Sequence, residues 1–184
     1  MQLKRGVRIL ALNGSRFNKK GGKELVIGII GREGLIEGSL SFYVGVDGDD
    51  STESLIKALE ESKFGEQVKI IVINGITLAG LNILDFEEIA KRTMAGMIAI
   101  TRKKPRKSLL IASLHKDPER EYKEAVIRNT YKKVKIARIE GFHFQLLGVD
   151  EDYARSMAKE LLSLLRIAHI ISSGIALGES GGRI

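Results

Sequence analysis

The carboxylates near position 50 are the side chains whose types and spacing best suit chemistry. The stretch VDGDDSTE, at the junction of a predicted strand and a predicted helix, carries Asp47, Asp49, Asp50 and Glu53. Oxygen ligands of this kind bind magnesium, although the stretch lacks the pattern of the twelve-residue calcium loop. Helix capping is the alternative, because Asp50 and Glu53 have the spacing of a capping box. Capping leaves Asp47 unexplained, so this residue is the stronger candidate for a metal ligand.

A second chemical feature is a run of positive charge after a predicted strand. The segment TRKKPRK, residues 101–107, contains Arg102, Lys103, Lys104, Arg106 and Lys107. Pro105 opposes helix continuation and favours an extended, exposed segment. Cations presented in this way suit contacts with phosphate groups, which position a protein on nucleic acid without reading sequence. A solvated face without a ligand explains the same residues equally well.

Composition limits the possible partners and sites. Thirty Lys and Arg against 23 Asp and Glu give a formal net charge of +7, which favours polyanionic partners. The lack of Cys excludes disulfides, thiolate nucleophiles and Cys-ligated metal sites. We expect His115, His143 and His169 to be packing or surface residues, because no two have the spacing of a helical zinc pair. In the tail GESGGR, Arg183 could meet a phosphate, and a flexible terminus explains the tail equally well.

The length and hydropathy predict a folded, water-soluble protein. A chain of 184 residues with 43% hydrophobic content can bury a continuous core, so we expect residues 1–184 to form one domain. Its apolar stretches are shorter than the ~20 residues of a membrane span, and no leader precedes the first predicted strand. These features predict a cytoplasmic protein that does not contact a membrane.

The first half of the chain predicts a mixed sheet. Three apolar runs predict antiparallel strands over 7–13, 24–34 and 38–48. Leu55, Ile56 and Leu59 have helical spacing and predict a helix over 49–65, with Gly65 as its stop. The apolar run 67–74 then predicts a fourth strand, parallel to an earlier one by a right-handed crossover.

The second half predicts further elements with clear boundaries. The expected order is a short helix over 84–94, a fifth strand over 96–102, a helix over 117–131, a hairpin over 133–149, an amphipathic helix over 150–166 and a closing strand over 167–172. Asp117 as cap and Pro118 at the first helical position mark one helix start. Glu140 and Gly141 mark the turn of the hairpin.

Four stretches of this chain carry a resemblance to a known family. RILALNGSRF, VGVDGDDSTE, INGITLAGLNILDF and LRIAHIISSGIALGESGGR together resemble the archaeal uncharacterised family related to endonuclease V. The resemblance covers nearly the whole chain, and the third and fourth stretches are specific. Endonuclease V enzymes adopt an RNase H-like fold and cut strands near deaminated adenine with magnesium. The resemblance therefore implies an α/β, RNase H-like fold with a mixed central sheet of about five strands, flanking helices and a possible extra hairpin.

The resemblance also implies where a catalytic site would lie. In those nucleases, acidic residues at the end of the first strand, on the third and after the fourth gather the metal that activates water. These positions correspond to Asn13, Asp47 and Asn74, so one acidic group remains. An amide oxygen can contact magnesium but brings no charge to offset the ion's desolvation. The resemblance thus implies a depleted metal site, with Asp47 and secondarily Asp49 as ligands.

Three functions remain open from the sequence. The leading hypothesis is a domain that binds structured or deaminated nucleic acid, with weak or absent cleavage. The second is a magnesium- or manganese-dependent endonuclease in which Asp47 acts with Asp49, Asp85 or Glu179. The third is a non-enzymatic module whose basic surface meets an acidic protein. The sequence does not predict the oligomeric state.

Overall fold

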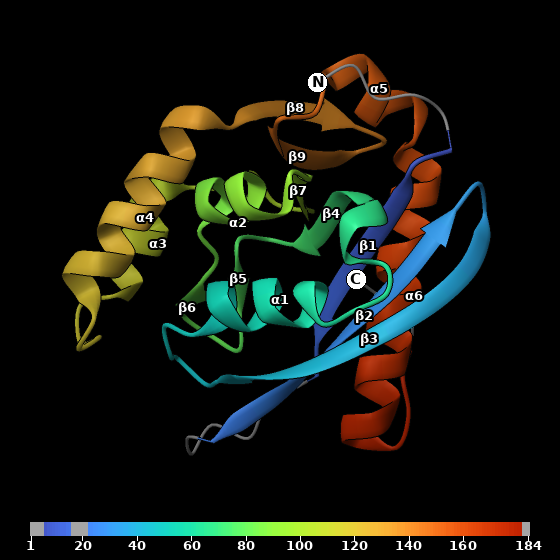
Figure 1. Ribbon diagram of the computed structural model, residues 1–184. Coiled ribbons are helices and arrows are strands. Elements are labelled where there is room, and N and C mark those ends of the chain that lie inside the picture. Colours follow the sequence, from blue (N-terminus) through green and yellow to red (C-terminus); the bar gives the residue numbers. More distant parts are fainter. Residues whose placement is uncertain (1–5, 16–21, 182–184) are drawn as a thin grey trace.

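A seven-stranded sheet forms the centre of the molecule in the computed structural model, which describes residues 6–15 and 22–181 (Figure 1). The strands are β1 (Arg8–Gly14), β2 (Lys23–Arg32), β3 (Leu35–Gly45), β4 (Val68–Asn74), β5 (Thr77–Leu78), β6 (Asn82–Ile83), β7 (Gly96–Thr101), β8 (Lys135–Ile139) and β9 (Phe142–Leu147). The helices are α1 (Ser51–Glu60), α2 (Phe86–Thr93), α3 (Lys107–Ser113), α4 (Arg120–Lys133), α5 (Glu151–Ser156) and α6 (Ala158–Leu177), with a 3-10 turn η1 (Gly65–Gln67).

The sheet has the mixed topology that the resemblance implied. Its strand order is β3-β2-β1-β4-β7-β9-β8, and β5 and β6 form a separate ribbon. The pairs β1–β2 and β2–β3 are antiparallel, whereas β1–β4 and β4–β7 are parallel. The expected α/β fold with a mixed sheet of five central strands and flanking helices is confirmed. The expected extra hairpin is β8–β9, which pairs with β7 and extends the sheet to seven strands.

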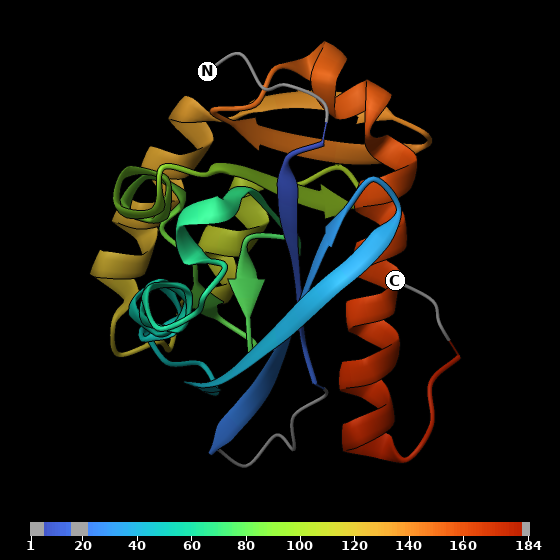
Figure 2. The ribbon, with the colours of Figure 1, turned by 45° about the vertical axis from the view of Figure 1, so that its right-hand side comes forward.

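Helices pack on both faces of the sheet. Figure 2 shows α6 along one face, with α1 and α2 on the opposite side. Because side chains alternate along a strand, β1 contributes to both layers. Leu12 belongs to the cluster that contains Leu55 of α1, whereas Ala11 belongs to the cluster that contains Leu165 of α6. Two buried layers therefore hold β1 and β4 in the middle of the molecule.

The predicted strand over 167–172 is wrong, because these residues continue α6. Ile167, Ile170 and Ile171 favour a strand locally. The helix prevails because Ala168 and Ser172 recur at helical spacing and are buried where α6 packs on β1 and β2. By length and composition α6 could also cross a membrane, and a third of its most apolar window is buried inside the protein.

The capping-box prediction for α1 is also wrong. Asp50 makes no side-chain cap. Its carboxylate instead accepts hydrogen bonds from the Gly45 amide at 2.9 Å and the Asn82 amide at 2.7 Å. Glu53 pairs with Arg92 at 2.6 Å. Tertiary partners thus take both carboxylates that local spacing had assigned to the helix start.

Two helix boundaries and one additional helix differ from the sequence expectation. The first helix ends at Glu60 rather than at Gly65. The helix expected from Asp117 begins at Arg120, although the Asp117 carboxylate accepts a hydrogen bond from the Glu119 amide at 2.9 Å. Helix α3, which starts at Lys107, was not predicted. Such shifts of a turn are common where exposed helix ends compete with loop geometry.

Candidate functional site

Two of the three positions implied by the resemblance meet at one edge of the sheet. Strands β1, β4 and β7 are parallel, so their carboxyl ends lie at the same edge. Leu12 pairs with Ile73 and Asn74 pairs with Ile100. Asn13 therefore lies beside Asn74, and residues 102–107 leave the sheet from the neighbouring strand.

A small cavity opens at this edge. Its volume is about 150 Å³, and its lining residues are Leu12, Asn13, Gly14, Glu24, Ile73, Asn74, Thr77, Leu78 and Ala79. A water molecule occupies ~30 Å³ in the liquid, and drug-sized ligands need ~300 Å³ or more. The cavity therefore has room for part of a small polar group, but not for a whole nucleotide.

Asn13 is fixed by helix α6. Its buried amide donates to the Ser172 hydroxyl at 2.9 Å and to the Gly14 carbonyl at 2.7 Å. The same nitrogen lies 3.4 Å from Nδ1 of His169. His169 therefore lies beside a candidate site residue from which 156 positions separate it in the chain. Sequence spacing among the histidines alone could not reveal this neighbour.

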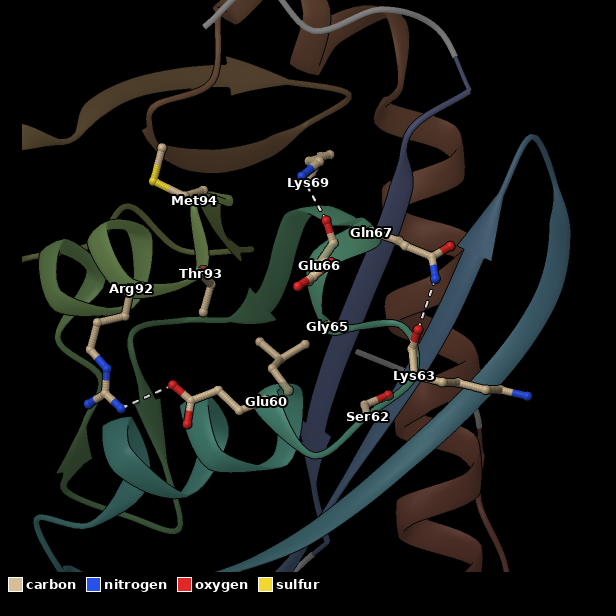
Figure 3. A pocket seen from close by; sticks show the side chains of 11 residues that line it. Glu60, Ser62, Lys63, Gly65, Glu66, Gln67, Lys69, Arg92, Thr93 and Met94 are labelled. Carbon is tan, nitrogen blue, oxygen red and sulfur yellow. Dashed lines mark hydrogen bonds and ion pairs between the residues drawn. The ribbon is translucent and has the colours of Figure 1, made fainter.

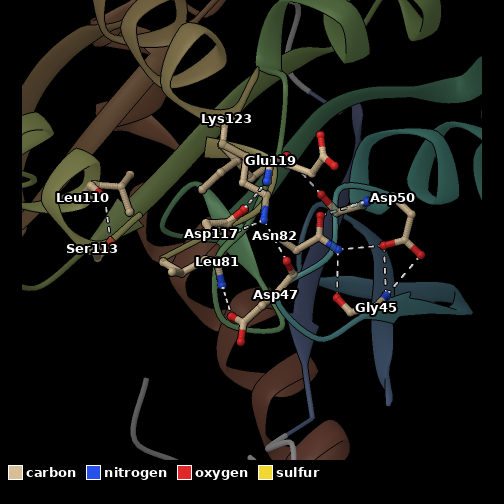
Figure 4. Close-up of polar contacts among 12 residues, drawn as sticks. Gly45, Asp47, Asp50, Leu81, Asn82, Leu110, Ser113, Asp117, Glu119 and Lys123 are labelled. Atoms are coloured by element: carbon tan, nitrogen blue, oxygen red, sulfur yellow. Dashed lines mark hydrogen bonds and ion pairs between the residues drawn. The ribbon is translucent and has the colours of Figure 1, made fainter. Parts of the chain in front are cut away.

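Asp47 reaches the cavity only indirectly. Its carboxylate accepts a hydrogen bond from the Leu81 amide at 2.8 Å (Figure 4). Its own amide donates to the Ala79 carbonyl, also at 2.8 Å. Its backbone is left-handed, with φ of 55°. Asp47 thus holds the β5–β6 turn by two hydrogen bonds. Ala79 of this turn lines the cavity, whereas Asp47 itself does not. Asp49 is exposed on the same loop.

A buried ion pair supports this loop from α4. Lys123 donates to the Asp117 carboxylate at 2.6 Å and to the Asp47 carbonyl at 2.7 Å (Figure 4). The two side chains are only 1% and 3% exposed. A buried ammonium is tolerated when it is paired and hydrogen-bonded. The arrangement joins α4, the segment before it and the β3–α1 loop into one support.

Glu24 is the site residue that the sequence analysis missed. Its side chain is buried at 4% exposure and lines the cavity. Its Oε2 atom has no hydrogen-bond partner in the described part of the chain. Burial raises the pKa of the Glu24 carboxyl to about 7. The available signal was an isolated carboxylate in the otherwise apolar run ELVIGII.

The remaining acidic candidates lie elsewhere. Asp85 caps α2 by accepting from the Glu87 and Glu88 amides, and Glu179 is exposed beyond the end of α6. Among residues 6–15 and 22–181, no group of three or more Asp, Glu, His or Cys side chains could hold a metal ion. Among the described residues, the side-chain donors that line the cavity are one carboxyl, two amides and the Thr77 hydroxyl, so they offer a divalent ion at most one anionic ligand.

The predicted nucleic-acid-binding residues form an exposed segment at the same sheet edge. Arg102, Lys103, Lys104, Arg106 and Lys107 are all exposed. Arg102 lies over the ring of Phe142, 5.9 Å from its centre. Salt bridges within the described residues involve none of these five cations. Arg183 lies outside the described residues.

A larger groove lies at the opposite edge of the sheet, where β4 and β7 begin (Figure 3). Its volume is about 640 Å³, and it lies between the ends of α1 and α2. Its walls carry charges of both signs, and Arg92 is already paired with Glu53 and Glu60. This groove does not include Asn13, Asn74 or the basic segment.

Comparisons with known proteins agree on one family. The family model described as endonuclease dU matches residues 5–176. The UPF0215 protein of Methanothermobacter thermautotrophicus is 30% identical over 190 residues, which cover 98% of this chain and 93% of that protein. The UPF0215 protein of Methanopyrus kandleri is 31% identical over 189 residues, with coverage of 97% and 96%. A solved protein of unknown function from Archaeoglobus fulgidus is 27% identical, with a TM-score of 0.80 and coverage of 94% and 99%.

Proposed function

This chain belongs to the endonuclease dU family, and from that premise we propose that it binds nucleic acid along the sheet edge formed by the ends of β1, β4 and β7. The observation that carries the proposal is the meeting of Asn13, Asn74 and the segment 102–107 at this edge. Five exposed cations attract phosphates, and the net charge of +7 favours the encounter.

We further propose that cleavage by a metal-activated water is weak or absent. The amides of Asn13 and Asn74 contribute no negative charge to the cavity, and Asp47 is bound to the β5–β6 turn. In other enzymes, removing one group that stabilises the transition state costs on the order of 10²-fold or more in rate. A cytoplasmic location, expected from the sequence, is part of this proposal.

Electrophoretic titration against single-stranded, double-stranded, deoxyuridine-containing and inosine-containing DNA and RNA tests binding. We expect binding at low salt that weakens steeply as salt rises. Replacing Lys103 and Lys104 by Gln should weaken all complexes and lower the salt slope by about two phosphate contacts. The matched control replaces the exposed Lys57 and Lys63 by Gln. Equal loss in both variants, or no binding at low salt, would contradict the proposal.

A magnesium- or manganese-dependent endonuclease is the alternative, and the description of the matching family favours it. It requires Asp47 to act with Asp49, Asp85 or Glu179 after rearrangement of the β3–α1 loop. Cleavage of deoxyuridine-containing DNA with either metal, abolished by Asp47→Ala in a folded variant, would support this alternative. Intact substrates with both metals would reject it.

A further inference from the structure

We propose that the cavity beside Glu24 receives the edge of one unpaired nucleobase, and that an N–H group of the base donates a hydrogen bond to the Glu24 carboxyl. The proposal rests on the proposed binding of nucleic acid and names the part of the ligand that enters the site. It assigns a binding role to a residue on β2, the strand that pairs with β1.

The first argument is the unsatisfied state of the Glu24 carboxyl. Buried polar atoms normally have hydrogen-bond partners, and one that lacks them carries a desolvation cost. Within the described residues, the buried side-chain atoms without a partner are Glu24 Oε2, Thr130 Oγ1 and Gln145 Nε2. Glu24 alone among these three residues lines the cavity at the strand ends. A donor placed in this cavity would meet the Glu24 carboxyl, and a rotation of the carboxyl would bring the buried Oε2 to that donor.

The second argument is how the carboxyl is held. Gly14 has no side chain, and a Cβ built there would lie 1.9 Å from Oε1 of Glu24. The carboxyl therefore occupies space that any other residue at position 14 would fill. Both Gly14 and Glu24 line the cavity. The pair places a hydrogen-bonding group in the wall of the cavity, beside the strand end that carries Asn13.

The third argument separates a base from a phosphate. No Lys, Arg or His among residues 6–15 and 22–181 lines the cavity, so within this described part of the chain a phosphate here would meet a carboxyl without a compensating cation. Phosphates have the exposed cations of residues 102–107 at the neighbouring strand end instead. Nucleobases carry N–H groups on their pairing edges, and enzymes read unstacked bases through such hydrogen bonds. The volume of about 150 Å³ suits an edge rather than a whole nucleotide.

The chemistry of the carboxyl suits this ligand in either protonation state. As a carboxylate it offers two acceptors, and as a neutral acid it offers one acceptor and one donor. A base edge that places an N–H beside a carbonyl matches the neutral acid at both positions. An N–H donor alone matches the carboxylate. Recognition therefore depends on an acceptor at position 24 and not on a fixed charge.

The test compares single-stranded oligothymidylate with an abasic oligomer of equal length, so that phosphate charge is constant. For the unaltered protein we expect roughly tenfold tighter binding to the base-bearing strand. In Glu24→Ala this ratio should fall close to one, while affinity for the abasic strand stays within about twofold. Glu24→Gln should keep most of the preference, because the amide carbonyl still accepts an N–H. Glu61→Ala, which removes an exposed carboxylate at the C-cap of α1, is the matched control and should keep the full ratio.

A second variant tests the proposal if Glu24→Ala does not fold. Gly14→Ala keeps the Glu24 side chain but displaces its carboxyl, so this variant should also lower the ratio. An unaltered protein that binds both oligomers equally overturns the base pocket and leaves nucleic-acid binding intact. Equal weakening of both complexes by Glu24→Ala has the same meaning. Failure of the unaltered protein to bind either oligomer at low salt overturns the proposed function itself.

Discussion

Lys123 and Glu24 are both buried ionisable side chains, yet their surroundings differ. Lys123 is 1% exposed and has two oxygen partners, at 2.6 and 2.7 Å. Glu24 is 4% exposed, and its Oε2 has no partner within the described residues. The first group is fully satisfied by the fold and supports a loop. The Glu24 carboxyl lines a cavity and keeps one oxygen without a partner among the described residues, as we expect of a group that binds a ligand.

Breaking the satisfied pair should have the largest effect on stability. Lys123→Ala leaves the Asp117 carboxylate buried without its cation, and we expect a loss of about 3–5 kcal/mol in the free energy of unfolding. Urea denaturation measures it. The exposed pair of Lys57 and Glu61, 3.8 Å apart, is the control, and Lys57→Ala should cost less than about 1 kcal/mol. A small loss for Lys123→Ala would mean that the pair is hydrated in solution.

The double variant Lys123→Met with Asp117→Leu tests whether the loss of stability in Lys123→Ala comes from the unpaired charge. Apolar replacement removes both charges together, so much of the stability should return. The remaining deficit reports two lost hydrogen bonds, from Lys123 to the Asp47 carbonyl and from the Glu119 amide to the Asp117 carboxylate. If the double variant is no more stable than Lys123→Ala, stability depends on these two hydrogen bonds rather than on charge pairing.

The raised pKa of the Glu24 carboxyl should make the free energy of unfolding depend on pH. The folded protein holds a proton on Glu24 up to about pH 7, whereas the unfolded chain releases it near 4.5. The unfolded state thus binds fewer protons in this window, and stability falls as pH rises from about 4.5 to 7. We expect a decrease on the order of 1–3 kcal/mol from this group.

Glu24→Gln should remove this contribution and make the protein more stable than the unaltered chain at pH 8. Thermal or urea unfolding between pH 5 and pH 8 measures the difference. Glu61→Gln changes the same charge at an exposed position and should leave the pH profile unaltered. Parallel pH profiles for Glu24→Gln and the unaltered protein would show that the carboxyl ionises normally.

The smallest expected effect concerns the fit between Gly14 and Glu24. Gly14→Ala should destabilise the protein by about 1–2 kcal/mol, because the new Cβ displaces the carboxyl. In the background of Glu24→Ala the same substitution should cost little, so the two effects are non-additive. A double-mutant cycle by urea denaturation measures this coupling. Additive effects would mean that the two residues do not share the space.

The fold could be predicted largely from local pattern. Alternating and continuous apolar runs marked β1, β2, β3, β4 and β7, and the helix between β3 and β4 predicted a parallel pairing. The family resemblance read from four stretches is also confirmed. The strand predicted over 167–172 failed because β-branched residues signal a strand locally, while packing against β1 and β2 selected a helix.

The candidate site could be predicted only in part. Asn13 and Asn74 were found as strand ends, and their shared cavity agrees with parallel pairing. Whether they act on a ligand stays a prediction. Glu24 and His169 had no spacing signal, because their neighbours Gly14 and Asn13 come from another part of the chain.

The sequence by itself determined the order of elements, the basic segment after β7 and the amides at the ends of β1 and β4. These features depend on residue type and on spacing along one strand or helix. Only the tertiary structure decided which charges are satisfied. The Asp47 carboxylate accepts a hydrogen bond from Leu81, Lys123 donates to the Asp47 carbonyl, and Glu24 Oε2 has no partner within the described residues. Hydrogen bonding and desolvation depend on which atoms meet in space, and residues far apart in the chain supply those atoms.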